Sequence, residues 1–82
     1  MDIAIARDLA RTSLRIGREI IDTLHFLKAN LPEEEYRSLA PEIAMALDGI
    51  HVALMNVAIA RYPELEKEID AGIEKYGRYL GP

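Results

Sequence analysis

The sequence of 82 residues contains no cysteine and no tryptophan, and it has a single phenylalanine. Without cysteine the chain can form no disulfide, and it has neither a catalytic thiol nor cysteine-ligated zinc. A single domain of this length buries only a modest part of its surface, and small domains commonly compensate with disulfides, metals or self-association. Because disulfides are excluded, self-association is the leading expectation for this one-domain chain.

Long apolar runs are also missing. The longest segment without a formal charge, residues 49–60, has twelve residues, whereas a membrane-spanning helix needs roughly 18–20. The chain begins Met1-Asp2-Ile3, and Arg7 soon interrupts any apolar stretch, which is atypical of a signal peptide. We therefore expect a soluble, cytoplasmic protein without a membrane partner, and the lack of cysteine fits a reducing compartment.

The sequence lacks the motifs of the common catalytic and cofactor sites. It has no glycine-rich phosphate loop, no His-Glu-x-x-His and no Gly-x-Ser-x-Gly. Its net charge of −4 at pH 7 argues against general nucleic-acid binding. We therefore predict a protein that is not an enzyme, and we predict neither a cofactor nor a metal site.

What the sequence has in quantity is apolar residues that favour helices. Half of its residues are hydrophobic, chiefly Ala, Ile and Leu. Pro32, Pro41 and Pro63 each stand where a helix can begin. These signals predict an all-α fold with helices at about residues 2–29, 33–39, 41–61 and 63–79, followed by a frayed tail. Pro41 either separates two helices or kinks a continuous one.

The first helix and the combined 33–61 segment are nearly equal in length, and a tight turn joins them. We therefore predict an antiparallel helical hairpin. The first helix is amphipathic, and Ala6, Ala10, Ser13 and Gly17 lie within its apolar arc at steps of four, three and four. Small residues allow a second helix to approach closely, which we take as the reason for Gly17.

The 41–61 segment carries two apolar stripes on opposite sides. A helix that is apolar nearly all round must be buried nearly all round, and the short last helix can cover only part of the second stripe. We therefore predict that a second copy covers it, so that two hairpins pair into a four-helix bundle. The first stripe consists of Ile43, Leu47, Ile50, Leu54 and Val57, and the second, the predicted interface, of Met45, Gly49, Val52, Asn56 and Ile59.

Four arginines, Arg7, Arg11, Arg15 and Arg18, form a ridge on the polar side of the first helix. The ridge has three interpretations: a solvated face paired with Asp8, Glu19 and Asp22, a docking site for an acidic protein surface, or a nucleic-acid contact. The three glutamates at 33–35 of another subunit could supply the acidic surface. Phe26 projects near the same arc, where either Tyr36 and the 33–39 helix or a partner protein covers it.

The sequence contains Asp-x-x-His twice, as Asp22 with His25 and as Asp48 with His51. Residues three apart share a helix face, and the spacing is similar to the Glu-x-x-His ligand pairs of di-iron bundles. However, Asp22 lies opposite the apolar arc of the first helix, so it points away from a bundle core. Despite this objection, the spacing leaves an alternative function, a helical bundle that binds a small ligand or a metal through the two histidines and two aspartates.

The patterns together favour a non-enzymatic interaction, assembly or regulatory module that acts as a homo-oligomer through helix-face packing. The two-sided apolar helix and the lack of active-site motifs carry this hypothesis.

Overall fold

The computed structural model describes residues 1–81, which contain helices and no strand. Helix α1 spans Ile3–Asn30. A continuous second helix, Glu33–Arg61, consists of α2 (Glu33–His51), a π-helical turn at Val52–Asn56 and α3 (Val57–Arg61). Helix α4 spans Leu65–Tyr76. The all-α prediction is thereby confirmed, with three helices instead of four.

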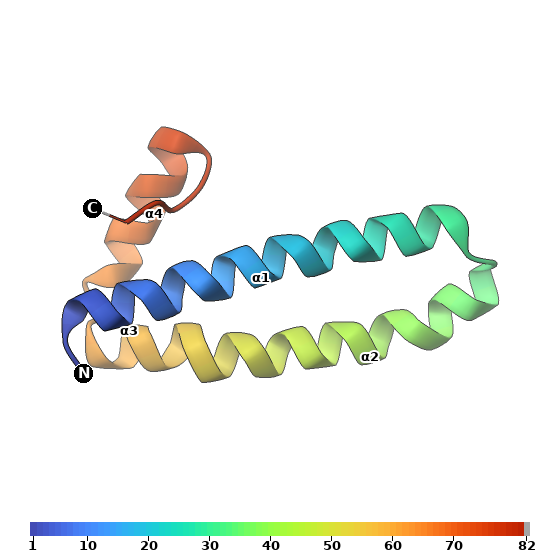
Figure 1. The fold of residues 1–82 in the computed structure, drawn as a ribbon, viewed down its shortest axis with the longest axis horizontal. Helices are drawn as coiled ribbons and strands as arrows, with labels where there is room; N and C mark the ends of the chain where they lie inside the picture. The colour runs from blue at the N-terminus through green and yellow to red at the C-terminus, as the bar shows by residue number, and fades with distance from the viewer. Residues whose placement is uncertain (82) are drawn as a thin grey trace.

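The first two helices run antiparallel along most of the molecule (Figure 1). Asp2 caps α1 by accepting a hydrogen bond from the backbone N–H of Ile5 at 2.9 Å. Leu31 ends that helix in an extended conformation, and Pro32 leads directly into α2. The glutamates at 33–35 then occupy the first turn of α2, where negative charge complements the helix dipole. These local signals explain why the chain reverses at residues 31 and 32.

Pro41 lies inside α2, so the prediction of separate helices at 33–39 and 41–61 is wrong and the continuous alternative holds. Proline removes one hydrogen bond from a helix and crowds the carbonyl four residues earlier. Both Pro41 and Arg37, which supplies that carbonyl, are exposed. Water can therefore satisfy the unbonded carbonyl, and the apolar contacts on the other side of the helix keep it continuous.

The π-helical turn changes which side of the second helix faces the rest of the chain. A π-helical turn holds more residues than an α-helical turn, so the residues after it are rotated out of the earlier pattern. Val57, predicted to continue the first apolar stripe, is 37% exposed, whereas Met55 and Ala58 are buried. The predicted stripe therefore ends at Leu54.

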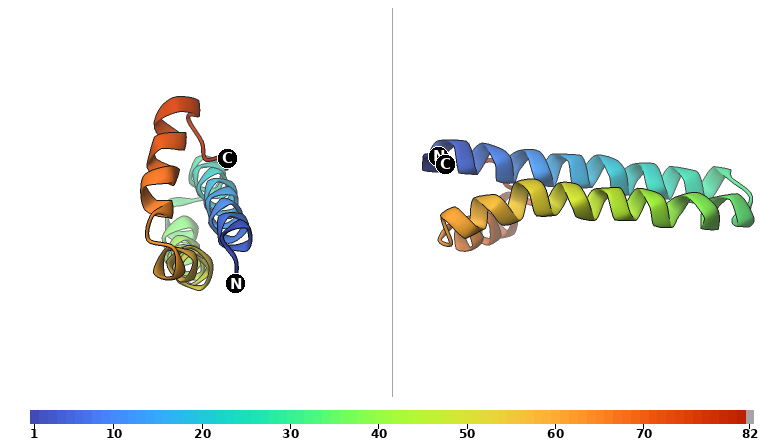
Figure 2. Two further views of the ribbon diagram at one scale, coloured as in Figure 1. Left: turned by 90° about the vertical axis from the view of Figure 1, so that its left-hand side faces the viewer. Right: turned by 90° about the horizontal axis from the view of Figure 1, so that it is seen from below.

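Helix α4 leaves the hairpin at a steep angle (Figures 1 and 2). It ends at Tyr76 because Gly77 adopts the left-handed conformation with φ 76°, and the Gly77 N–H donates to the carbonyl of Ile73 at 2.8 Å. The helix is thus shorter than the predicted 63–79. The tail beyond it returns to the hairpin, where Tyr79 is only 6% exposed. The prediction of a frayed tail is therefore wrong for Tyr79, while Pro82 lies outside the described residues.

The buried core lies at one end of the hairpin, where α4 and the tail pack against it. No side chain from residue 14 to residue 54 is buried. We call residues 14–54 the two-helix arm, and the remainder of the described chain the three-helix end. The core of the three-helix end consists of Ala6, Ala10, Ser13, Met55, Ala58, Leu65, Ile69 and Tyr79.

The molecule is elongated, with extents of 45 × 25 × 15 Å and a radius of gyration of 14.8 Å. A compact chain of this length would have a radius of gyration of about 12 Å. Its accessible surface is 5833 Å², whereas a compact monomer of 9.2 kDa would expose about 4,900 Å². The single chain thus leaves roughly 900 Å² more surface in water than a compact fold of its size.

Candidate interaction surfaces

The predicted interface stripe is split by the π-helical turn. Met45 and Val52 are 64% and 58% exposed, and a Cβ added at Gly49 would meet nothing within 4 Å. Asn56 is also exposed. Ile59, by contrast, is partly buried and packs against the core of its own chain, and its part in an interface stays a prediction. We call Met45, Gly49, Val52 and Asn56 the outward strip.

A groove runs between the two helices of the arm, on the side next to the three-helix end. Gly17 lines it, and a Cβ added there would meet only Leu47 Cδ1, at 4.0 Å. Alanine would therefore fit, and the expectation that close packing within the chain requires Gly17 is wrong. The small residues Ala6, Ala10 and Ser13 do lie in the core. The groove is lined by Ser13, Leu14, Gly17, Arg18, Ile21, Leu47, Asp48 and His51.

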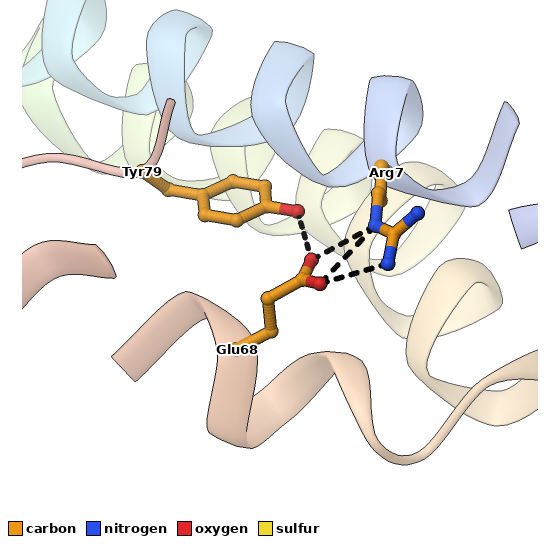
Figure 3. A network of polar contacts seen from close by, with 3 residues as sticks. All are labelled: Arg7, Glu68 and Tyr79. Carbon is orange, nitrogen blue, oxygen red and sulfur yellow. Dashed lines mark hydrogen bonds and ion pairs between the residues drawn. The ribbon is translucent and has the colours of Figure 1, made fainter. Parts of the chain in front are cut away.

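The first arginine of the ridge contacts α4 and is only partly exposed. Arg7 forms a two-pronged ion pair with Glu68, in which Nη2 donates to Oε1 at 2.9 Å and Nε donates to Oε2 at 3.1 Å (Figure 3). The Tyr79 hydroxyl donates to the same carboxylate at 2.5 Å. This network ties α1, α4 and the tail together. Sequence reasoning missed it, because residues 61 positions apart leave no local pattern.

The network shifts the pKa values of its members. Hydrogen bonds from Arg7 and then Tyr79 lower the pKa of the Glu68 carboxyl, because they favour its charged form. Burial, followed by the hydrogen bond to Glu68, raises the pKa of Tyr79 to about 12. At neutral pH the tail is therefore held by a neutral phenol donating to a charged carboxylate.

The remaining arginines of the ridge lie beside the tail. Arg11 donates to the Asp8 carboxylate at 3.3 Å and to the Leu80 carbonyl at 3.1 Å. The predicted local partner Asp8 is thereby confirmed. Over residues 1–81, Arg15 and Arg18 form no ion pair with Glu19, Asp22 or any other carboxylate. A surface pocket, which we call the basic pocket, is lined by Arg11, Leu14, Arg15, Arg18, Arg78, Tyr79 and Leu80.

Phe26 is 64% exposed near the tip of the arm. The prediction that Tyr36 or the start of the second helix covers it is therefore wrong within this chain. Docking by Phe26 and by Arg11, Arg15 and Arg18 stays a prediction, whereas Arg7 is occupied by Glu68.

The two histidines lie on different parts of the arm. His51 and Asp48 line the groove, whereas His25 and Asp22 are exposed further along α1. Eight residues of helix separate Gly17, at the groove, from His25, which corresponds to about 12 Å. Over residues 1–81 no three side chains of His, Asp or Glu gather into a group that could hold a metal. The two Asp-His pairs are therefore not brought together within one chain, and the ligand-binding alternative stays a prediction.

By length and composition alone, the Glu33–Arg61 helix could cross a membrane. Its 29 residues begin with charged residues within 33–37, and in the apolar remainder, residues 38–60, Glu42 and Asp48 carry the only formal charges. No protein-family model, curated protein or solved structure matches the chain. Its function must therefore be argued from the surfaces described above.

Proposed function

We propose that this protein is a non-enzymatic interaction module that acts as a homo-oligomer, with the two-helix arm as its contact surface. The observation that carries the proposal is the absence of any buried side chain from residue 14 to residue 54. Two helices in contact can cover only one side of each other, so the large apolar residues of the arm stay half exposed. A second hairpin would complete a four-helix arrangement.

The size of the uncovered surface supports this proposal. The chain exposes roughly 900 Å² more than a compact monomer, and a standard protein interface buries about 800 Å² on each partner. The outward strip contributes Met45 and Val52, both more than half exposed. Between residues 38 and 60 the only formal charges on the second helix are those of Glu42 and Asp48. An interface there would therefore bury few charges.

The proposal is tested by measuring the mass in solution with light scattering on a size-exclusion column over a tenfold concentration range. We expect a mass at least twice the 9.2 kDa of the chain. Replacing the outward apolar residues in a Met45→Glu, Val52→Glu double variant should lower the mass to that of the monomer, because association would bury two unpaired carboxylates. Helical circular dichroism should be retained, because both positions are exposed.

A matched control places the same chemistry elsewhere. Ile73 and Tyr76 on α4 are 42% and 57% exposed, and they lie outside the arm. An Ile73→Glu, Tyr76→Glu double variant should keep the wild-type mass. A wild-type chain that stays monomeric throughout the range would contradict the proposal, and so would equal masses for the two double variants.

A second candidate function is attachment to a lipid bilayer through the second helix. The 29-residue helix Glu33–Arg61 favours it, because apolar residues on most of its sides suit a hydrocarbon environment as well as a protein interface. Flotation with uncharged phosphatidylcholine vesicles distinguishes the two functions. Recovery of the chain with the vesicles, abolished by the Met45→Glu, Val52→Glu changes, would favour the bilayer. Recovery in the soluble fraction with a dimer mass would favour the oligomer.

A further inference from the structure

The basic pocket lies where the tail meets α1, and it contains no residue of the outward strip. Arg11, Arg15 and Arg18 come from α1, and Arg78 comes from the tail. Leu14, Tyr79 and Leu80 supply its apolar lining. The pocket therefore combines guanidinium groups from two segments that are distant in the sequence with a hydrophobic surface.

Contacts outside the pocket hold its tail side in place. Tyr79 is buried, and its hydroxyl donates to Glu68, which in turn binds Arg7 (Figure 3). Arg11 donates to the carbonyl of Leu80. The tail backbone on either side of Tyr79, at Arg78 and Leu80, is thus held against α1 within the folded chain. A ligand would not have to order this backbone, and only the exposed arginine side chains would lose freedom on binding.

The charges of the pocket are poorly balanced. Four arginines line it, and the only carboxylate that pairs with any of them over residues 1–81 is Asp8, bound to Arg11. Counted over residues 1–81, the local formal charge is +3, the difference between four guanidinium groups and one carboxylate, although the whole chain carries −4. Clustered positive charges repel one another unless an anion binds between them.

We propose that the basic pocket binds a phosphate group carried on a small apolar body. A phosphate monoester carries up to two negative charges and offers three oxygens to guanidinium forks, so it compensates a charge of +3 better than a single carboxylate does. The apolar side chains of Leu14 and Leu80 would contact the organic part. This inference does not depend on the outward strip.

The test is isothermal titration calorimetry of the full chain with phenyl phosphate, which has both an anionic and an apolar part. An Arg15→Gln, Arg18→Gln double variant removes two guanidinium groups that form no ion pair within residues 1–81. It should weaken binding at least about tenfold, because hydrogen bonds to charged groups are lost. An Arg37→Gln, Arg61→Gln double variant changes the net charge equally, away from the pocket. Its affinity should stay within about twofold of wild type, because distant exposed charges are screened.

A third variant tests whether the ligand binds in the pocket, which includes the tail, or only on the charged face of α1. Arg78→Gln alters only the tail side, and we expect it to weaken binding several-fold. Unchanged affinity in Arg78→Gln would overturn the proposed pocket. Equal affinity of the Arg15→Gln, Arg18→Gln and Arg37→Gln, Arg61→Gln double variants would overturn it as well.

Two further probes distinguish the source of the phosphate group. Vesicles that contain phosphatidic acid present it as a lipid headgroup, and inorganic phosphate presents it without an apolar body. Binding of phenyl phosphate that is lost in the Arg15→Gln, Arg18→Gln variant supports the pocket with a soluble ligand. If wild type binds the phosphatidic acid vesicles and the same variant does not, the pocket is supported with a lipid headgroup as its ligand. If wild type bound neither phenyl phosphate nor these vesicles, the inference would be overturned.

Discussion

The three-helix end and the two-helix arm are built from the same pair of helices, yet they bury their side chains to very different extents. At the three-helix end, Ala6, Ala10, Ala58 and Leu65 are 0% exposed. In the arm no residue is buried, although Leu14, Ile20, Leu24 and Leu27 face the second helix by their spacing. The difference shows that a third element is needed before a helix pair can bury its contact residues completely.

Along α1, the size of the side chains that face the rest of the chain differs between the two regions in the opposite direction from burial. The residues of α1 that are buried at the three-helix end are small, namely Ala6, Ala10 and Ser13, whereas the arm uses leucine and isoleucine in the equivalent positions. The single chain covers these larger residues only in part. Their transfer free energy, about 25 cal/mol per Å² of apolar area, is only partly realised in one chain. The arm therefore has stabilising free energy left to gain from association.

The largest effect is expected from a change in the core of the three-helix end. Leu65 is fully buried against α1 and the second helix, so Leu65→Ala should lower the free energy of unfolding by about 2–5 kcal/mol. Urea denaturation followed by circular dichroism, at a concentration where the chain is monomeric, measures the change. A loss of this size is a large fraction of the total stability of a small domain.

The matching change in the arm is Leu47→Ala, at a half-buried position beside the groove. Its side chain is partly in water already, and the groove leaves little new cavity, so we expect a loss of about 1 kcal/mol. If Leu47→Ala destabilised the dilute chain as much as Leu65→Ala, the distinction between the two regions would fail.

An effect of the opposite sign is expected from another change inside the arm. Pro41→Ala restores a helical hydrogen bond, and alanine is favoured over proline inside a helix by about 3 kcal/mol. The substitution also raises the conformational entropy of the unfolded chain, which opposes folding by up to about 1 kcal/mol. We therefore expect a net gain of about 2 kcal/mol in the free energy of unfolding, measured by urea denaturation.

Pro32 provides the control for this change. It precedes α2 with φ −55°, an angle that proline adopts without strain. Pro32→Ala should therefore lose up to about 1 kcal/mol. A loss of stability in Pro41→Ala would mean that the arm depends on the proline for the course of its second helix.

The sequence predicted the features that local patterns determine and missed those that depend on tertiary contacts. Apolar spacing and the position of Pro32 correctly predicted α1 and the hairpin. The π-helical turn at Val52–Asn56 has no motif of its own, and it moved Met55 and Ala58 into the core in place of Val57. Sequence alone left Pro41 undecided, because propensity favours a break while burial of the stripes favours continuity.

The same distinction between local patterns and tertiary contacts applies to the candidate surfaces. Exposure of Met45 and Val52 followed from the two opposite apolar stripes. The ion pair that occupies Arg7 did not, because Glu68 and Tyr79 come from segments with no fixed spacing to α1. One signal for Tyr79 was available in the sequence. A helix-ending glycine, Gly77, stands two residues before it, and the chain often turns back on its helix after such a glycine.

An effect similar in size to that of Leu47→Ala is expected in the network that joins the tail to the three-helix end. Tyr79→Phe removes one hydrogen bond to Glu68 and should cost about 1 kcal/mol at pH 7. The folded pKa of Tyr79 is raised to about 12, whereas an unfolded tyrosine titrates near 10. The stabilisation is therefore complete below pH 10 and is lost as the pH rises towards 12.

Because the chain has no tryptophan, phenolate absorbance at 295 nm reports its tyrosines directly. Tyr79→Phe should remove the titration step near pH 12 and reduce the alkaline loss of stability. Tyr76→Phe, at an exposed position on α4, should leave both unchanged.

Glu68 affects stability at acidic pH, because its pKa is lowered in the folded chain. Its contribution is present at neutral pH and is lost as the pH falls through its folded pKa. In Tyr79→Phe the acid transition should therefore move to higher pH. If it did not, the tail would be held at the three-helix end by packing of the tyrosine ring and not by its hydrogen bond to Glu68.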